Sequence, residues 1–206
     1  MRAPATWFAA LLLLAACGST SPSLSRAERE RLPLDGRQEI FDAENDLIIA
    51  LSRADLARDQ LQSVGKALDD LDEVQKSCER RLAGNPAQTG NIPQLRKVIR
   101  TEHDYLEARG DVASAEVKVA EQEVRIARSR LALVKQRQLV RIGKAPIASL
   151  KAYERAIDEQ EAKGKQVRST SLDLRTKAQG LLDLWKYTQA DYARQTGDFD
   201  SGIWLK

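Results

Sequence analysis

Residues 40–82, IFDAENDLIIALSRADLARDQLQSVGKALDDLDEVQKSCERRL, carry apolar side chains that recur every seven residues. The recurrence occupies two rows offset by three positions, and it continues over six heptads. Three or four such heptads already indicate a coiled coil. The stretch therefore predicts a long helix, from residue 36 to about residue 83, that packs against other helices. The first row is Ile40, Leu47, Ala54, Leu61, Leu68, Gln75 and Leu82, and the second is Ala43, Ala50, Ala57, Val64, Leu71 and Cys78.

Two further segments have a helical period, and prolines and glycines mark their ends. Residues 92–142 carry apolar side chains on a wider face, which suits contact with two neighbours, so we expect this helix in the middle. Residues 147–193 form a third helix with a weaker seam, because Gln160, Gly164 and Ser171 interrupt it. Short connections make consecutive helices antiparallel. The sequence thus predicts an all-α fold, a long antiparallel three-helix coiled-coil rod of roughly 70–75 Å over residues 36–193.

The N-terminal stretch MRAPATWFAALLLLAACGST decides where the protein is located. Arg2 and the amino group give it a positive start, and an uncharged apolar run follows over residues 5–16. A helix needs about 20 apolar residues to span a bilayer, and this run is shorter. A positive start, a short apolar core and small residues at the exit are typical of a secretory signal peptide. An uncleaved membrane anchor is the alternative that the short run disfavours.

The end of this run, Leu14, Ala15, Ala16 and Cys17, resembles the lipobox of bacterial lipoproteins. The resemblance implies cleavage before Cys17, acylation of its thiol, and anchoring of the mature chain by acyl groups. Gly18 follows, where Asp favours the inner membrane in enteric bacteria, so we expect the outer membrane of a Gram-negative bacterium, facing the periplasm. The predicted organisation is a signal peptide (1–16), lipidated Cys17 with a flexible tether (17–35), the coiled coil (36–193) and a C-terminal tail (194–206). An ordinary signal peptide, with Cys17 unmodified, is the alternative.

The composition argues against several classes of function. Aromatic residues make up 5% of the chain and charged residues 31%, a balance that is unusual for a compact enzyme and typical of long helices. The net charge of +3 is not concentrated in a patch, so we expect no nucleic-acid partner. His103, the only histidine, lies between Glu102 and Asp104, but adjacent residues of a helix point in different directions. We therefore predict no catalytic residue, no metal ligand and no cofactor.

Residues 127–166, ARSRLALVKQRQLVRIGKAPIASLKAYERAIDEQEAKGKQ, resemble the helical hairpin of TolC-type outer-membrane efflux factors. The matching positions are Ala127, Leu131, Gly143, Leu150 and Ala152. The resemblance covers only this hairpin, and it implies contact with a periplasmic adaptor or export component. If the first helix leaves the membrane, the connection distant from the lipid would make that contact. The predicted contact residues there are Gly84, Asn85, Pro86, Gly90 and Asn91.

A second resemblance is to the small murein lipoprotein of enteric bacteria, which combines a lipidated Cys, a heptad helix and a C-terminal Lys joined to peptidoglycan. Here Lys206 would occupy that place, and the resemblance implies a structural tether between outer membrane and peptidoglycan. Scaffold, transport accessory and tether all remain open from the sequence. Heptads also do not reveal whether a second copy of the chain satisfies part of the seam, nor whether Cys78 is buried in the seam or pairs between chains.

Overall fold

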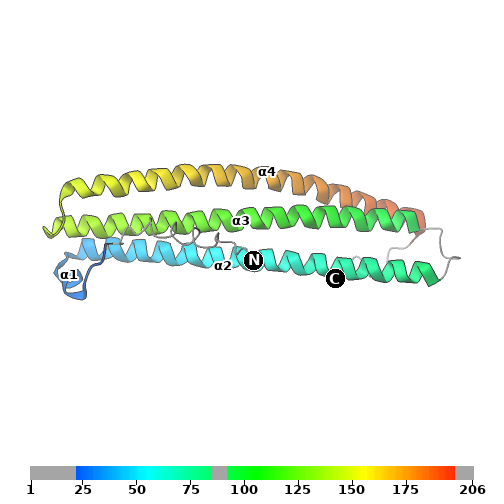
Figure 1. Cartoon of the computed structure of the whole chain (residues 1–206), viewed down its shortest axis with the longest axis horizontal. Helices are drawn as coiled ribbons and strands as arrows, with labels where there is room; N and C mark the ends of the chain where they lie inside the picture. Colours follow the sequence, from blue (N-terminus) through cyan, green and yellow to red (C-terminus); the bar gives the residue numbers. More distant parts are fainter. Residues whose placement is uncertain (1–21, 85–91, 198–206) are drawn as a thin grey trace, which may run out of the picture.

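The computed structural model describes residues 22–84 and 92–197. These residues form four α-helices and no strand, so the predicted all-α class is confirmed. A short helix α1 comes first, and three long helices follow it (Figure 1). The elements are α1 (Arg26–Arg31), α2 (Leu34–Gly84), α3 (Ile92–Arg141), the 3₁₀ turn η2 (Ile147–Ser149) and α4 (Leu150–Thr196).

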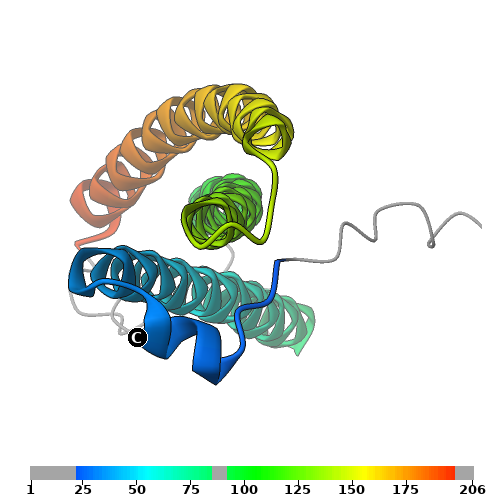
Figure 2. The same cartoon turned by 90° about the vertical axis from the view of Figure 1, so that its left-hand side faces the viewer.

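The long helices lie side by side, and α3 occupies the middle (Figure 1). Viewed along the long axis, α2 and α4 lie on opposite sides of α3 (Figure 2). This position accounts for the wide apolar face of α3, because one part of it contacts α2 and another contacts α4. The beginning of α2, the end of α3 and the beginning of α4 are at the same end of the molecule, next to α1. We call this the α1 end.

Small side chains form the middle of the contact between α2 and α3. Alanine dominates this cluster, and its small side chain lets two helix backbones approach closely without a cavity. Larger apolar side chains pack nearer the ends, around Leu32 at the α1 end and around Leu71 towards the far end. The buried members of the central cluster are Ala50, Ala54, Ala57, Ala120, Val124 and Ala127.

The contact between α3 and α4 corrects one expectation. Gly164 and Ser171 were expected to weaken the third helix, but both are buried against α3, in one heptad row with Ala178. A Cβ atom at Gly164 would lie 3.3 Å from Cδ1 of Ile126. At Gly164, therefore, the small residue leaves room for Ile126 of α3, and a larger side chain would not fit without a shift. The prediction considered only the low hydrophobicity of Gly164 and Ser171. At residue 164, the position of the Ile126 side chain limits the size of the side chain that fits.

The segment before α2 corrects a second expectation. Residues 17–35 were predicted to be a flexible tether, yet residues 26–31 form α1. Ser25 caps this helix: its hydroxyl accepts from the Glu28 N–H, and the Glu28 carboxylate accepts from the Ser25 N–H. Leu24 and Leu32, on either side of α1, are buried with Ile40 and pack on the end of α3. The two leucines hold a segment whose charged residues had suggested a linker.

Candidate functional site

Most of the predicted site residues lie outside the described residues, so the structure does not place them. Gly84 is the last residue of α2, and nothing is described of its surroundings. The remaining predicted residues outside the described ranges are Leu14, Ala15, Ala16, Cys17, Asn85, Pro86, Gly90, Asn91 and Lys206.

The described part carries an exposed apolar surface on α2, which we call the outer stripe. It consists of Phe41, Ile48, Ile49 and Leu56, whose exposed fractions are 61, 59, 50 and 61%. In a heptad projection these positions lie opposite the buried positions that contact α3. Phe41 and Ile48 form one row, and Ile49 and Leu56 form a second row about 100° further around the helix. Two rows of large apolar side chains that are half or more exposed are typical of a contact surface. This surface is the strongest candidate for function in the described part of the chain.

The sequence contained a signal for the outer stripe that the prediction overlooked. Phe41 and Ile48 are seven residues apart, and so are Ile49 and Leu56. Leu34, seven residues before Phe41, extends the first row and is 73% exposed. The sequence was interpreted as one seam for one partner, because the inner rows were longer and more regular. Apolar rows on two opposite faces of a helix would suit two sets of neighbours, and α3 covers only one of the two faces of α2.

A groove between α2 and α4 borders the outer stripe. Ala50, Ile126 and Ala127 contribute apolar surface to it, Ile49 belongs to both the groove and the stripe, and its cavity volume is about 460 Å³. Charged side chains also line it. Glu123 of α3 ion-pairs with Arg53 of α2 at 3.7 Å and with Arg168 of α4 at 3.3 Å. Arg130 of α3 and Glu161 of α4 form a further pair at 2.7 Å. These pairs link the three long helices across the groove.

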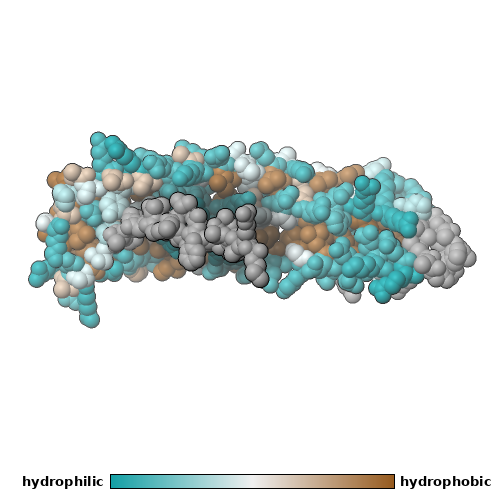
Figure 3. Space-filling view, viewed as in Figure 1, coloured by the Kyte–Doolittle hydropathy of each residue, from teal (hydrophilic) through white to brown (hydrophobic). Residues whose placement is uncertain are grey.

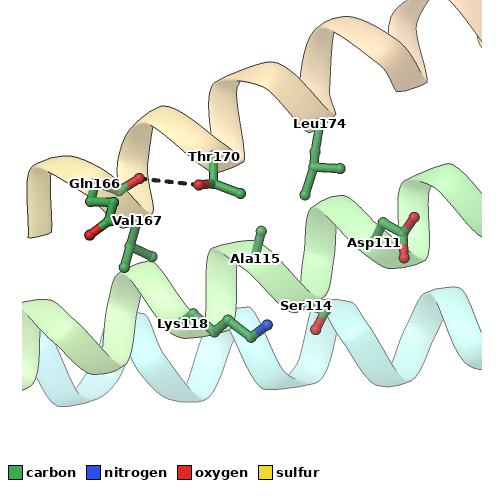
Figure 4. Close-up of a pocket in the computed structure, with 8 residues that line it drawn as sticks. All are labelled: Asp111, Ser114, Ala115, Lys118, Gln166, Val167, Thr170 and Leu174. Carbon is green, nitrogen blue, oxygen red and sulfur yellow. Dashed lines mark hydrogen bonds between the residues drawn. The ribbon is translucent and has the colours of Figure 1, made fainter. Parts of the chain in front are cut away.

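A second cavity, of about 600 Å³, lies between α3 and α4. Val167 and Leu174 point from α4 towards α3, whereas Asp111, Ser114 and Lys118 are spread along α3 (Figure 4). The Thr170 hydroxyl donates to the backbone oxygen of Gln166, 3.2 Å away on its own helix. Polar groups therefore do not converge on one point, as they do in a site that orients a small ligand. The surface seen in the direction of Figure 1 is mostly hydrophilic, with hydrophobic patches between the helices (Figure 3).

His103 lies close to two carboxylates: its sequence neighbour Asp104, which was expected to point elsewhere, and Glu107 in place of Glu102. One ligand atom each of His103, Asp104 and Glu107 lies within 4.8 Å of the others. The Nδ1 atom of His103 is 3.8 Å from Oε1 of Glu107, one turn further along α3. All three groups come from one helix. Burial raises the pKa of the neighbouring Glu102 carboxyl. The prediction that His103 is neither catalytic nor a metal ligand stays a prediction.

Buried polar pairs fix the alignment of α4 on α3. The side-chain amide of Gln122 donates to both the backbone and the side-chain oxygen of Gln160, at 2.8 Å each. Further along, the hydroxyls of Thr101 and Thr188 are 2.8 Å apart and buried. A shift of one helix along the other would break these bonds and leave the buried Gln122 amide without its partners, which costs more than the bonds contribute. The pairs are structural, because both members face the helix contact.

Ion pairs hold α1 at its end of the molecule. The Glu28 carboxylate accepts from the Lys144 ammonium, which follows α3, and Arg29 donates to Glu44 of α2 at 2.8 Å. The hydrogen bonds from Lys144 and then from Ser25 lower the pKa of Glu28 from 4.5 to about 2. Together with Leu24 and Leu32, these pairs make the chain before α2 a docked element.

No protein-family model, curated protein or solved structure matches the chain. Within the described residues, no helix is both long and apolar enough to cross a membrane.

Proposed function

We propose that this protein is a lipoprotein of the outer membrane, anchored through Cys17, whose periplasmic part is a three-helix antiparallel coiled-coil rod. It acts by protein–protein contact in the cell envelope, as a scaffold or accessory of a TolC-like transport assembly. The observation that supports action by protein–protein contact is the outer stripe, where Phe41, Ile48, Ile49 and Leu56 are half or more exposed within three heptads of one helix. The lipobox-like residues 14–17 support the anchor.

The position of α1 supports an upright orientation of the rod. Leu24 is docked at the α1 end and is only seven residues after Cys17, so the lipid lies within about 25 Å of it. The opposite end, where α2 leads to α3, is separated by a helix of 50 residues, or about 75 Å. In this orientation the connection over residues 84–93 reaches furthest from the outer membrane, where it would meet a component anchored in the inner membrane.

Replacing the acylated residue tests the anchor. In cells given labelled palmitate, the native chain should incorporate label and fractionate with the outer membrane. A Cys17→Ser variant should incorporate none and be recovered outside the membrane fraction. The matched control is Cys78→Ser, which leaves the lipobox-like residues intact and should behave like the native chain. Membrane retention of unlabelled Cys17→Ser would contradict the proposal.

In-cell crosslinking tests the contact function. Crosslinked partners of the full chain should include an envelope transport component, such as an adaptor, and substitutions at Asn85 and Asn91 should reduce that product. Matched substitutions at Lys163 and Lys177, exposed on α4, serve as the control. Recovery of cell-wall fragments attached to Lys206, with no transport component, would replace this role with that of a peptidoglycan tether.

A further inference from the structure

We propose that the outer stripe binds the outer stripe of a second copy of this chain, so that two α2 helices pair in parallel over residues 34–56. The inference rests on the proposed lipid anchor for one of its three arguments, and it names the partner of the proposed contact surface. The other two arguments are the spacing of the stripe and the charges on its flanks.

The spacing of the stripe identifies the partner as a helix. Leu34, Phe41 and Ile48 recur every seven residues, as the inner rows of α2 do. A heptad row matches another supercoiled helix better than it matches a flat surface. In this frame three polar residues, Gln38, Asn45 and Ser52, occupy the alternate core positions, which makes the pair less stable than a fully apolar coiled coil. A polar residue at such a position is tolerated in parallel pairs, where it meets its own copy and fixes the register.

The flanking charges identify the direction of the pair. In a parallel coiled coil, the residue that directly precedes a core position such as 38, 45 or 52 lies beside the residue five positions later in the other helix. That rule brings Arg37 of one copy beside Asp42 of the other, twice by symmetry, and both side chains are exposed. It also brings Leu51 beside Leu56, which adds apolar area. Glu44 comes beside Ile49 of the other copy, and its carboxylate keeps its ion pairs with Arg29 and Lys135 of its own chain. In an antiparallel pair, Asp42 would instead face Ile49 and Leu56, which buries a carboxylate against apolar groups.

The contact ends where the stripe ends. Asp55 is the next residue in the row of Phe41 and Ile48, and it would meet its own copy as a like charge. Within the chain its carboxylate is paired with Arg58 at 3.0 Å. The paired region is therefore about three heptads, near the α1 end.

The anchor places two copies at the same height. The docked Leu24 is only seven positions after Cys17, so the outer stripes of neighbouring copies lie at similar distances from the membrane. All copies on one membrane also point the same way. Confinement to a surface raises the effective concentration of the second stripe, which favours a parallel contact that would be weaker in solution.

Site-specific disulfides test the pairing on the full chain in the bacterial envelope. In a Cys78→Ser background that keeps Cys17, Phe41→Cys should form a covalent dimer. In a parallel pair its Cα atom faces its own copy within the 4.4–6.8 Å range of disulfides. Asn45→Cys, which keeps Phe41, should do the same. The matched control is Leu172→Cys, at a residue that is 60% exposed on the outer face of α4 and should remain monomeric.

Charge exchange tests the direction. Asp42→Arg should reduce the Asn45→Cys dimer, because it sets Arg37 against a second cation. Adding Arg37→Asp should restore the dimer. In cells that express Phe41→Cys and Leu56→Cys with different tags, Phe41→Cys should form a disulfide with its own copy. Little disulfide-linked product should form between residues 41 and 56.

Four results would overturn the inference: no dimer at residue 41 or 45, equal dimer at residue 172, a dominant disulfide between residues 41 and 56, or a disulfide to a different protein. Palmitate incorporation is measured on the same samples. A labelled chain without dimer rejects the pairing and leaves the anchor standing. An unlabelled chain that still dimerises rejects the anchor and leaves the pairing standing.

Discussion

Single residues set the distance and alignment of α3 and α4. Gly164 lets α4 approach Ile126, and the Thr101–Thr188 pair fixes the position of one helix along the other. Neither role follows from the residue type, because glycine and threonine are weak helix formers and often mark loops. The roles follow from the contacts that these residues make between α3 and α4.

Leucine at residue 164 should destabilise the protein. Even a Cβ atom there lies 3.3 Å from Ile126 and 3.7 Å from Gln122, so Gly164→Leu should lower the free energy of unfolding by about 1–3 kcal/mol. The matched control is Gly180→Ala, where a Cβ atom has no neighbour within 4 Å, so the better helix former should raise stability by up to about 1 kcal/mol. Urea unfolding measures both. Unchanged stability of Gly164→Leu would show that α4 is not held closely to α3.

The threonine pair should behave as a coupled unit. Each hydroxyl lies within hydrogen-bonding distance of a backbone oxygen of its own helix, Thr101 of Val98 and Thr188 of Trp185, and of the other hydroxyl. Because each hydroxyl has one proton, the bond between the helices forms when one hydroxyl donates to the other instead of to its own helix. Thr101→Val should cost about 1–2 kcal/mol, because it leaves the other buried hydroxyl with fewer partners. The double variant with Thr188→Val should cost less than the sum of the single changes.

An exposed threonine supplies the control for this cycle. Thr170 also bonds a backbone oxygen of its own helix, but it faces solvent, so Thr170→Val should change the free energy of unfolding by less than about 0.5 kcal/mol. Strictly additive effects at residues 101 and 188, measured by urea unfolding, would contradict the coupling.

Among the elements, α1 differs most from what was expected. Its capping residues Ser25 and Glu28 have the spacing of a capping box, which is a sequence signal for a helix start. The prediction did not use this signal, because the alternating charges of residues 26–31 suit a solvated helix and a linker equally. Six residues cannot form a stable helix alone, so tertiary contacts through Leu24 and Leu32 decide that α1 forms.

Docking of α1 should depend on pH through Glu28. Its pKa is about 2 in the folded chain, against 4.5 for the unperturbed group, because Lys144 and Ser25 bond the charged form. A lowered folded pKa stabilises docking above the unfolded value. That contribution is complete above about pH 4.5 and is lost as the pH falls towards 2. The backbone dynamics of residues 26–31, measured by NMR relaxation, should therefore increase over this range.

Glu28→Gln is the control for this titration. It should loosen α1 at neutral pH and remove most of the pH dependence between 4.5 and 2, while the long helices keep their circular dichroism. The same pH dependence in Glu28→Gln as in the native chain would assign the effect to other carboxylates.

At the scale of the whole molecule, the arrangement is elongated because α2 and α4 each pack along most of the length of α3. A helix of 50 residues is about 75 Å long, and the adjacent helices add width and little length. Ion pairs between neighbouring helices, such as Arg175 with Glu116 at 2.7 Å, lie at the exposed edges of the contacts. Each contributes little by itself, and the burial of apolar side chains between the helices contributes most of the stability.

Small-angle X-ray scattering should show the elongated shape. For the chain from residue 22 onward, we expect a radius of gyration of about 23 Å, whereas a compact domain of this length would give about 16 Å. A parallel dimer would double the mass and lengthen the particle little, whereas an antiparallel pair overlapping only at the outer stripe would lengthen it clearly. A radius near that of a compact domain would contradict the side-by-side arrangement.

The sequence by itself determined the three long helices, because periodic apolar rows and helix-ending prolines and glycines act within one segment. The predicted ranges 36–83, 92–142 and 147–193 lie within a few residues of α2, α3 and η2 with α4. The tertiary structure decided the docking of α1, the burial of Gly164 and Ser171, and the exposure of Phe41 and Ile48. Each of these features depends on which side chains of another helix lie opposite the residue. A periodic apolar row in the sequence does not reveal whether another helix covers that row.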